Sequence, residues 1–288
     1  LNGFTTGKVT LQKVEDTVSN ITSIDAIDSN DVSMGAAAIT VSDAASLTDA
    51  TAINDFTTGK VTLSSVEDTY SNIQSIKSIP DAQVDMGAAA VKVSDNVTKT
   101  EVDDLRTDTT GNITLTSLTE DKGNLATING FTDVILSTAN ITVTDNVNKL
   151  EADAIDAYSD TSGVVTLTSI TDTVENVNSV QSNANISLAT SSITVTDAAS
   201  LTDANTIKEF TNAQVTLNVV QDTVSNISSI NLIDSSDVSM AAAAVTVTDA
   251  ASLADATAIN GFTEGLVTLN LVQDTVSSIL SLINISEP

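Results

Sequence analysis

The chain of 288 residues contains no histidine, no cysteine and no tryptophan. Histidine is the commonest general base and metal ligand in proteins, and cysteine supplies thiol nucleophiles, zinc ligands and disulfides. Lacking both, the sequence offers few of the residues on which catalysis and metal binding usually depend. We therefore expect that the chain is not an enzyme, that it contains no catalytic residue, and that it requires no cofactor.

Positive charge and aromatic side chains are also scarce. Ten Lys and Arg stand against 38 Asp and Glu, which leaves a formal net charge of −28, and aromatic residues make up 2% of the chain. Binding to nucleic acid needs basic residues to neutralise phosphates, and base stacking needs aromatic rings. No apolar run approaches the roughly 20 residues of a membrane helix. We expect neither nucleic-acid binding nor membrane insertion.

Apolar residues, by contrast, are abundant. They make up 41% of the chain, while charged residues make up 17%. Disordered acidic chains combine low hydrophobicity with high charge, and this composition is closer to that of a globular protein. The sequence therefore predicts a folded protein whose core consists of Val, Ile, Leu and Ala.

An internal repeat runs through the sequence. The motif Val-Thr-Leu followed by Val-Glu-Asp-Thr at 61–69 has counterparts that begin at Val9, Ile113, Val165, Val215 and Val267, at spacings of 52, 52, 52, 50 and 52 residues. Fixed periods of this length are typical of repeat architectures. We interpret residues 1–288 as a single repeat array of about five and a half units of 52 residues, and as a fragment of a longer chain.

A second repeated motif lies between the copies of the first. The segment Ile-Thr-Val-Ser-Asp-Ala-Ala-Ser-Leu at 39–47 returns at 193–201 and 245–253, with weaker copies from Val91 and Ile141. Together the two motifs supply eleven triplets of the form apolar-polar-apolar, ten of them centred on Thr. This alternation predicts eleven strands with one buried and one exposed face.

Helical patterns follow both kinds of triplet. After the 61–63 type, apolar residues recur at helical spacing, as in Val66, Tyr70, Ile73 and Ile76, and Ser-Ser-Val-Glu at 64–67 resembles a capping box that would start the helix. After the 39–41 type, Asp43 occupies an N-cap position, 44–56 contains helix formers, and Thr-Thr-Gly at 57–59 would end the helix.

Strand and helix alternate in steps of 22 to 30 residues, which is typical of one coil of a solenoid. The predicted fold class is therefore α/β, a repeat solenoid whose coils of strand plus helix resemble those of leucine-rich repeats, with a parallel sheet on one side. Tandem all-β repeats are the alternative. A short alternation around Val84 and Met86, repeated at Val32, Ile186 and Val238, suggests a minor extra strand.

Three columns of polar residues are candidate sites. The first consists of Asp43, Asp95, Asp145, Asp197 and Asp249. These residues could cap helices or bind Ca²⁺, but calcium needs six to eight oxygens at one point, and one Asp in every second coil does not supply them. The same two interpretations apply to Glu15, Asp16, Asp68 and Asp222, where the helix dipole favours a carboxylate without an ion.

The second column comprises Asn20, Asn72, Asn124, Asn176 and Asn226, with Ser278 in the last copy. It could form an amide ladder between coils or be a plain polar position. The third column is an exposed row of threonines: Thr10, Thr40, Thr62, Thr114, Thr142, Thr166, Thr194, Thr216, Thr246 and Thr268. Such a row could bind ice or a glycan, or could simply reflect strand propensity.

One region departs from the repeat, and it lies between residues 94 and 125. Lys99, Arg106 and Lys122 gather there with Lys92, among several acidic residues. An active site would be an irregular place of this kind, but drift within one repeat also accounts for it. No serine has a histidine partner, and no glycine-rich phosphate loop follows a strand.

These motifs resemble the Ala-, Thr- and Asp-rich repeats of very large secreted bacterial surface proteins, described as adhesin-like, hemolysin-like or S-layer-like. The matching stretches include 245–253 and Asp-Thr-Val-Ser-Asn-Ile at 222–227. The resemblance implies an extracellular, cell-surface location. The chain lacks the Gly-Gly-x-Gly-x-Asp nonapeptides that bind calcium in RTX proteins.

From the repeat and the resemblance we expect a structural segment of a large extracellular bacterial surface protein. It would act as a rigid spacer, fibre, or surface-layer or adhesin element. Repeat sequence occupies both 1–11 and 266–285, so the expected partners are flanking repeats or other copies joined end to end. The alternative is an ice- or glycan-binding module that uses the Thr rows, with surface glycans as partners.

Overall fold

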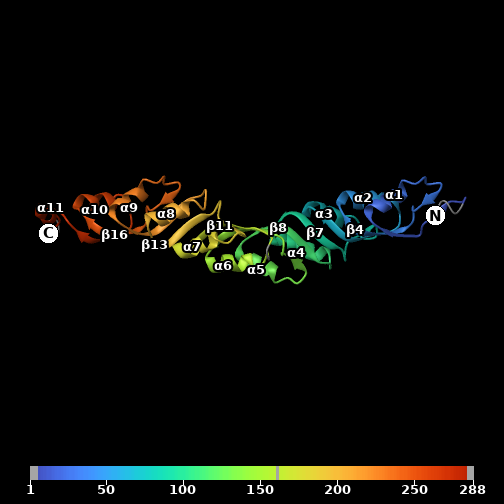
Figure 1. Cartoon of the computed structure of the whole chain (residues 1–288). Coiled ribbons are helices and arrows are strands. Elements are labelled where there is room, and N and C mark those ends of the chain that lie inside the picture. Colours follow the sequence, from blue (N-terminus) through green and yellow to red (C-terminus); the bar gives the residue numbers. More distant parts are fainter. Residues whose placement is uncertain (1–5, 160–161, 284–288) are drawn as a thin grey trace. The chain divides into compact units, whose positions relative to one another are not determined.

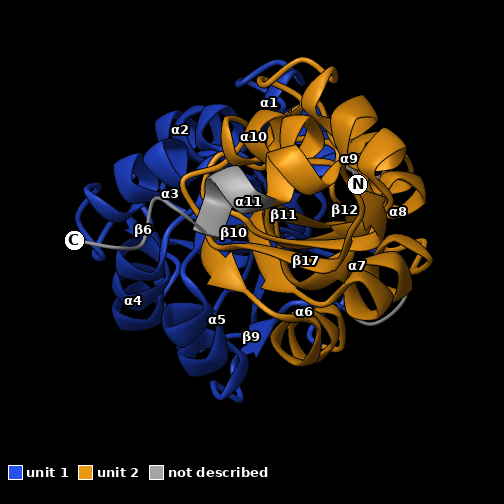
Figure 2. Ribbon diagram, turned by 90° about the vertical axis from the view of Figure 1, so that its left-hand side faces the viewer, with its two compact units in different colours: residues 1–141, 158–163 blue, residues 142–157, 164–288 orange. Residues whose placement is uncertain are grey.

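The structure of the chain is a computed structural model that describes residues 6–159 and 162–283. It contains two compact units, which Figure 2 shows in separate colours. Unit 1 comprises Leu1–Ile141 and Tyr158–Gly163, and unit 2 comprises Thr142–Ala157 and Val164–Pro288. The repeat continues in both units, so the same coil can be compared in each.

Strands and helices alternate along the chain, as Figure 1 shows. The elements of the first half are β1 (Val9–Thr10), β2 (Lys13–Asp16), α1 (Val18–Asp25), β3 (Val32–Ser33), β4 (Ala38–Ala45), α2 (Leu47–Phe56), β5 (Val61–Asp68), α3 (Tyr70–Lys77), β6 (Val84–Asp85), β7 (Ala90–Val97), α4 (Lys99–Asp108), β8 (Ile113–Glu120), α5 (Lys122–Asn129) and β9 (Val134–Ile135). Those of the second half are β10 (Asn140–Val147), α6 (Lys149–Asp156), β11 (Val165–Asp172), α7 (Val174–Gln181), β12 (Ile186–Ser187), β13 (Ser192–Ala199), α8 (Leu201–Lys208), β14 (Val215–Asp222), α9 (Val224–Asn231), β15 (Val238–Ser239), β16 (Ala244–Ala251), α10 (Leu253–Asn260), β17 (Val267–Val272) and α11 (Val276–Ile283).

The sheet confirms the predicted α/β class and the parallel stacking of coils. Within each unit the long described strands form a parallel sheet, to which the short strands β6, β9, β12 and β15 pair, and β1 and β3 form a separate pair. Within unit 1 the long strands follow the order β2-β4-β5-β7-β8, and within unit 2 the order β11-β13-β14-β16-β17. Each long strand inside these orders therefore pairs with the long strand of the coil before it and with that of the coil after it, as in a solenoid.

Aliphatic side chains form short ladders across neighbouring strands. One ladder joins Val14, Ile39, Val61 and Val84 in register. The next ladder begins at Val66, five residues further along β5 than Val61, and continues in register through Val91 and Ile113 to Val134. Each ladder thus spans about one repeat unit before the next one starts further along the strand.

The core of each unit lies between the ladders and the helices. All members of the two ladders except the half-buried Val134 are buried, and the inward residues of the helices, such as Ile73 and Ile76 of α3, are fully buried as well. Consecutive helices, including α1 with α2, α2 with α3 and α8 with α9, contact each other. Figure 2 shows the helices outside the strands. A coil therefore buries its apolar face only when its neighbours are present.

Strands are longer and helices start later than the sequence predicts. The structure continues β5 to Asp68, so Ser64–Glu67 is strand and forms no capping box, and α3 begins at Tyr70 after the N-cap Thr69. Likewise Asp43 lies within β4, and α2 begins at Leu47 after the N-cap Ser46. The cause is tertiary, because a second inward-facing residue of each strand, such as Val66, extends the pairing onto the next coil.

Two smaller predictions are confirmed. The short apolar alternations form β3, β6, β12 and β15, and an equivalent strand, β9, occurs in the third copy of the 52-residue repeat. Helix α2 ends at Phe56 and its C-cap is Thr57, where the Thr-Thr-Gly sequence predicts a stop. The C-terminal end of α2 was therefore predicted better than its N-terminal start.

Candidate functional site

The recurrent carboxylates cap the helix of the preceding coil. Asp43, in β4, accepts a hydrogen bond at 2.8 Å from the backbone N–H of Val18, the first residue of α1. Asp68, at the end of β5, accepts one at 2.9 Å from the N–H of Leu47, the first residue of α2. The prediction that Asp43 caps the helix after it is therefore wrong, although its role as a helix cap is right.

The same contact recurs along both units at 2.6–2.9 Å. The remaining pairs of donor N–H and acceptor carboxylate are Tyr70 with Asp95, Lys99 with Glu120, Lys149 with Asp172, Val174 with Asp197, Leu201 with Asp222, Val224 with Asp249, and Leu253 with Asp274. Donor and acceptor are 21 to 25 residues apart, which is one coil. We call these seven carboxylates, together with Asp43 and Asp68, the capping column.

A β-bulge directs the carboxylates of the 39–47 type. The pairing of β4 with β5 shifts between Val41 and Ala44, so that Ser42 and Asp43 together oppose one residue of β5. The same shift occurs between Val195 and Ala198, beside Asp197. A bulge re-aims the side chain of the extra residue, and here that side chain reaches the neighbouring helix.

An asparagine directs the carboxylates of the 61–69 type. Asp68 Oδ1 accepts hydrogen bonds from the Thr69 N–H and from the Asn72 side chain, both at 2.8 Å, while Oδ2 bonds to Leu47. The equivalent amides of Asn20, Asn124, Asn176 and Asn226 donate to Asp16, Glu120, Asp172 and Asp222 at 2.7–2.8 Å. The asparagines therefore orient carboxylates within one coil and do not form the amide ladder between coils that the sequence suggested.

Most helix N-termini also receive a local cap. Ser46 Oγ accepts a hydrogen bond from the backbone N–H of Asp49, and the Asp49 carboxylate accepts one from the backbone N–H of Ser46. The two bonds form a capping box. Thr69 Oγ1 accepts in the same way from the N–H of Asn72. The local residue serves the third amide of the helix and the carboxylate from the next coil serves the first. Two of the four free amides of a helix N-terminus are thus satisfied.

These bonds keep several carboxyl groups ionised. Burial raises the pKa of Asp68, but hydrogen bonds from Leu47, Asn72 and Thr69 outweigh it and leave the pKa below its ordinary value. The pKa values of Asp172 and Asp222 are lowered through the same balance of burial and hydrogen bonds. Hydrogen bonds to the charged form stabilise it, and the positive end of the helix dipole acts in the same direction.

The geometry of the capping column bears on the calcium hypothesis. The carboxylate oxygens whose hydrogen bonds are given above accept from backbone amides and, in the 61–69 type, also from an asparagine side chain. Among residues 6–159 and 162–283, no group of three or more acidic side chains is placed so that it could hold a metal ion. The expectation that the chain requires no cofactor or metal stays a prediction, which a Ca²⁺ titration would test.

The threonines expected to form an exposed row are mostly half-buried, and they form short rows and not one continuous column. Thr40 pairs with Thr62, but the row ends in Glu15 on one side and Asp85 on the other. The following row begins on β5 at Glu67, because the register moves with the aliphatic ladders. The expectation of an uninterrupted Thr column is therefore wrong.

One row within unit 2 consists of hydroxyl residues alone. Thr171, Thr194, Thr216 and Ser239 lie in register on β11, β13, β14 and β15. Elsewhere, the outer threonines Thr116 and Thr168 donate to the carbonyls of Val93 and Val143 at 2.8 Å. Two members of the row also form hydrogen bonds within the protein: Thr171 Oγ1 donates to Asn146 Oδ1 at 3.1 Å, and Ser239 Oγ accepts from the Ala241 N–H at 3.5 Å.

The basic residues of the irregular region have separate partners. Lys92 pairs with Glu67 across two strands at 2.6 Å. Arg106 pairs with Asp133 at 2.8 Å and lies over the ring of Phe131, 3.7 Å from its centroid. These contacts join neighbouring coils and form no convergent set of catalytic groups. Lys92 and Arg106 therefore form structural ion pairs between coils.

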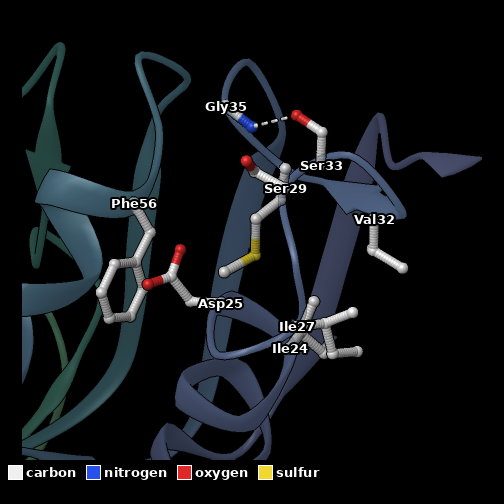
Figure 3. Close-up of a pocket in the computed structure, with 9 residues that line it drawn as sticks. Ile24, Asp25, Ile27, Ser29, Val32, Ser33, Gly35 and Phe56 are labelled. Carbon is white, nitrogen blue, oxygen red and sulfur yellow. Dashed lines mark hydrogen bonds between the residues drawn. The ribbon is translucent and has the colours of Figure 1, made fainter. Parts of the chain in front are cut away.

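Small pockets occur at equivalent places in the two units. Figure 3 shows one of about 140 Å³ between Phe56 and the pair Ile24 and Ile27, near the Gly35 N–H that donates to Ser33 Oγ at 3.5 Å. Its counterpart of about 90 Å³ in unit 2 includes Phe262. Both volumes lie below the roughly 300–1,000 Å³ of small-molecule sites. Recurrence in both units makes the pocket a feature of the repeat.

Sequence reasoning missed a buried threonine in the turn after the helices of the 39–47 type. Thr57 Oγ1 donates to the Ala37 carbonyl at 2.6 Å and accepts from the Gly59 N–H at 2.9 Å. Thr109, Thr211 and Thr263 make the same two contacts in their coils. The Thr-Thr-Gly signal was visible, but only the partner in the preceding turn reveals that its first hydroxyl is buried.

Comparisons with protein families, with characterised proteins and with solved structures found no match. Among the described residues, no helix is long and apolar enough to cross a membrane. The repeat, the capping column and the hydroxyl rows are therefore the features of the chain that bear on its function.

Proposed function

We propose that the chain is a structural repeat segment of a large extracellular bacterial surface protein, in which it acts as a rigid spacer, fibre, or surface-layer or adhesin element. The capping column is the observation that carries this proposal. Each coil supplies the carboxylate that completes the helix of the coil before it, as Asp222 does for Leu201. Within each unit, neighbouring coils are thereby joined by side chains as well as by the sheet.

This linkage suits a mechanical role. In solenoids, stability is the sum of terms within coils and between neighbours, so stronger neighbour terms make the array resist local opening. Parallel strand pairing, buried aliphatic ladders and carboxylate caps all contribute to the same interfaces. The cell-surface location is supported by the likeness of the motifs to repeats of secreted bacterial proteins.

Stretching single molecules tests the mechanical part of the proposal. The 288-residue chain, held by handles at both ends in optical tweezers, should stay folded at low force and then unfold in discrete steps. Asp222→Ala should lower the force of one step, whereas the control Asp237→Ala, at an exposed position in the same unit, should leave it unchanged. Smooth extension without steps would refute a rigid spacer.

Antibody labelling tests the location. Antibodies raised against the chain should label intact cells of the bacterium that produces it. Labelling that appears only after the cells are made permeable would place the protein inside and would exclude a surface role. The two experiments fail independently, because a rigid segment can exist in any compartment.

The hydroxyl row supports a second candidate function, the binding of ice or a repetitive glycan. Its four members lie in register on adjacent strands, so neighbouring hydroxyls are about 4.8 Å apart. Thermal hysteresis and a glycan array test this candidate. Thr194→Lys, in the centre of the row, should abolish binding, and Thr40→Lys, in the short row of unit 1, should not.

A further inference from the structure

A polar pocket opens at the C-terminal end of α2 in unit 1. Its volume is about 370 Å³, which falls within the roughly 300–1,000 Å³ of small-molecule sites. The lining comprises Asn54 and Asp55 of α2, the turn at 57–59, and Gln83, which directly precedes β6. The pocket is therefore large enough for a small ligand, unlike the pocket beside Phe56.

The backbone around this pocket is held in place. The Thr58 N–H and Oγ1 both donate to the Gly35 carbonyl, at 2.9 and 3.0 Å. A Cβ atom on Gly59 would clash with a carbonyl oxygen of the preceding coil, so the turn packs there as closely as glycine allows. On the other side, the Val61 N–H donates to the Gln83 carbonyl at 2.7 Å. The pocket is therefore preformed, which reduces the cost of ordering on binding.

Three side chains of the lining have no partner among the described residues. Neither the amides of Asn54 and Gln83 nor the carboxylate of Asp55 forms a hydrogen bond or an ion pair there. Asn54 is half-buried, while Asp55 and Gln83 are exposed, so a ligand can reach all three from solvent. We call Asn54 and Gln83 the amide pair. A few polar groups placed around a preformed cavity are typical of small-molecule sites.

The chemistry of these groups selects a class of ligand. Each amide offers two N–H donors and one oxygen acceptor, and the carboxylate only accepts. An anion would meet the negative charge of Asp55, and Ca²⁺ would find one carboxylate where it needs six to eight oxygens. A hydroxyl group both donates and accepts, so a neutral molecule with several adjacent hydroxyls matches a carboxylate beside two amides.

Equivalent coils place charged groups at the positions of the amide pair. In the coil of α4, Arg106 and Asp133 occupy these two positions and form an ion pair at 2.8 Å. Side chains at the two positions are therefore close enough to meet across the pocket. In unit 2 the equivalent residues are Lys208 and Asp237, which line a pocket of about 260 Å³. The amide pair instead leaves neutral donors and acceptors available to a neutral ligand.

We propose that the pocket binds one neutral sugar unit, a hexose with free vicinal hydroxyl groups. The Asp55 carboxylate accepts hydrogen bonds from two neighbouring hydroxyls, and the amide pair donates to and accepts from the others. A free hexose and the end unit of a glycan present the same hydroxyls. The inference goes beyond the proposed structural function and does not depend on it, since a rigid segment can carry a sugar site or lack one.

A titration followed by nuclear magnetic resonance tests the proposal. Glucose, galactose, mannose, lactose and maltose are added separately to the 288-residue chain up to about 100 mM, because a small polar ligand in an open pocket should bind with a Kd of about 1–10 mM. At least one sugar should shift the side-chain amide resonances of Asn54 and Gln83 saturably, whereas calcium chloride and sodium sulfate should not. Tighter binding of a disaccharide than of its hexoses would support the end of a glycan as the ligand, and equal binding would support a free sugar.

The coil of α4 supplies a matched variant. Asn54→Arg combined with Gln83→Asp installs the ion pair of that coil, and it should weaken sugar binding at least about ten-fold while circular dichroism shows an unchanged fold. Asp55→Asn should weaken binding about ten-fold, whereas Asp81→Asn, at an exposed acid outside the lining, should have no effect. Thr194→Lys, in the hydroxyl row of unit 2, should also leave binding unchanged, which separates the two candidate sugar sites.

The outcomes separate the alternatives. Absence of saturable shifts with every sugar overturns the inference. Sugar binding that persists at full strength in both the double variant and Asp55→Asn places the sugar elsewhere and overturns it as well. Larger shifts of the amide pair with calcium or sulfate than with any sugar would refute the class of ligand. None of these results affects the stretching experiment, so the proposed function stands or falls separately.

Discussion

Replacing Asp222 with alanine tests the capping column most directly. Its carboxylate joins two coils of unit 2, because Oδ2 accepts from the Leu201 N–H at 2.9 Å in α8. Its Oδ1 accepts from the Thr223 N–H and the Asn226 side chain, both at 2.8 Å, within its own coil. The variant removes all three bonds, but their consequences differ.

The bond to Leu201 dominates the expected cost. A side-chain cap contributes about 0.5–2 kcal/mol to stability, and a net charged hydrogen bond about 1.5–3 kcal/mol. The carboxylate of Asp222 is only partly buried, so solvent screening places the loss towards the lower end, at about 1.5 kcal/mol. A change of this size raises the opening equilibrium of the first turn of α8 about ten-fold.

Hydrogen exchange measures this opening residue by residue. The Leu201 amide should exchange about ten times faster in Asp222→Ala, although residue 201 precedes the substitution by 21 positions. Asp237→Ala removes the same charge from an exposed position in the same unit and should leave Leu201 protected. Faster exchange confined to α9, the helix that follows Asp222, would show that the carboxylate acts only locally and would refute the linkage between coils.

Three further predictions concern acid, the core and the buried threonines. Burial raises the pKa values of Asp68, Asp172 and Asp222, but hydrogen bonds outweigh it and keep the folded-state pKa values below the unfolded value of 3.8. The three carboxylates therefore stabilise the fold fully above about pH 4, and this stabilisation is lost as the pH falls through the folded-state pKa values. The urea midpoint of unfolding should fall over this pH range, and it should fall less steeply in Asp222→Asn. Ile227→Ala should destabilise unit 2 by about 3 kcal/mol in urea unfolding, and the matched Ile279→Ala, at a partly exposed position, by about 1 kcal/mol; equal effects would contradict the burial argument. Thr109→Val keeps the shape of the side chain but removes its bonds to the Ala89 carbonyl and the Gly111 N–H, and calorimetry should show a loss of about 1–3 kcal/mol, whereas the exposed Thr110→Val should cost less.

The pattern of apolar residues was sufficient to predict the order of the elements. Alternation at Val61 and Leu63 marked a strand, and Ile73 and Ile76 marked the inward face of a helix. These signals are local, because the periods of strands and helices differ and a solenoid repeats them in every unit. The parallel stacking also followed, since coils of 22 to 30 residues return each strand to the same side.

Element boundaries and the roles of the acidic residues were harder to predict. Val66 fits the helical stripe of Ile73 and Ile76, yet it lies in β5, where pairing with Val91 extends the strand. Asp43 precedes a run of good helix formers, yet a bulge turns its side chain towards Val18 of the preceding coil. In both cases a neighbour in space decided between two local interpretations that the sequence supported equally.

The candidate site shows the same division. The repeated carboxylates and threonines were visible as columns in the sequence, and their chemistry as helix-capping acids and strand residues was inferred correctly. The register was not visible, because each aliphatic ladder starts five residues beyond the last and carries the outward-facing residues with it. This shift divides the threonines into short rows and leaves Thr171, Thr194, Thr216 and Ser239 as a uniform one.

By itself, the amino-acid sequence determined which residues are strand or helix formers, how often they recur, and which positions carry acid. The tertiary structure decided which coil each acid serves and how far each strand extends. The physical reason is that hydrophobic periodicity acts within a few residues, whereas a hydrogen bond such as that from Leu47 to Asp68 forms only after the chain has completed a coil and brought the two residues together.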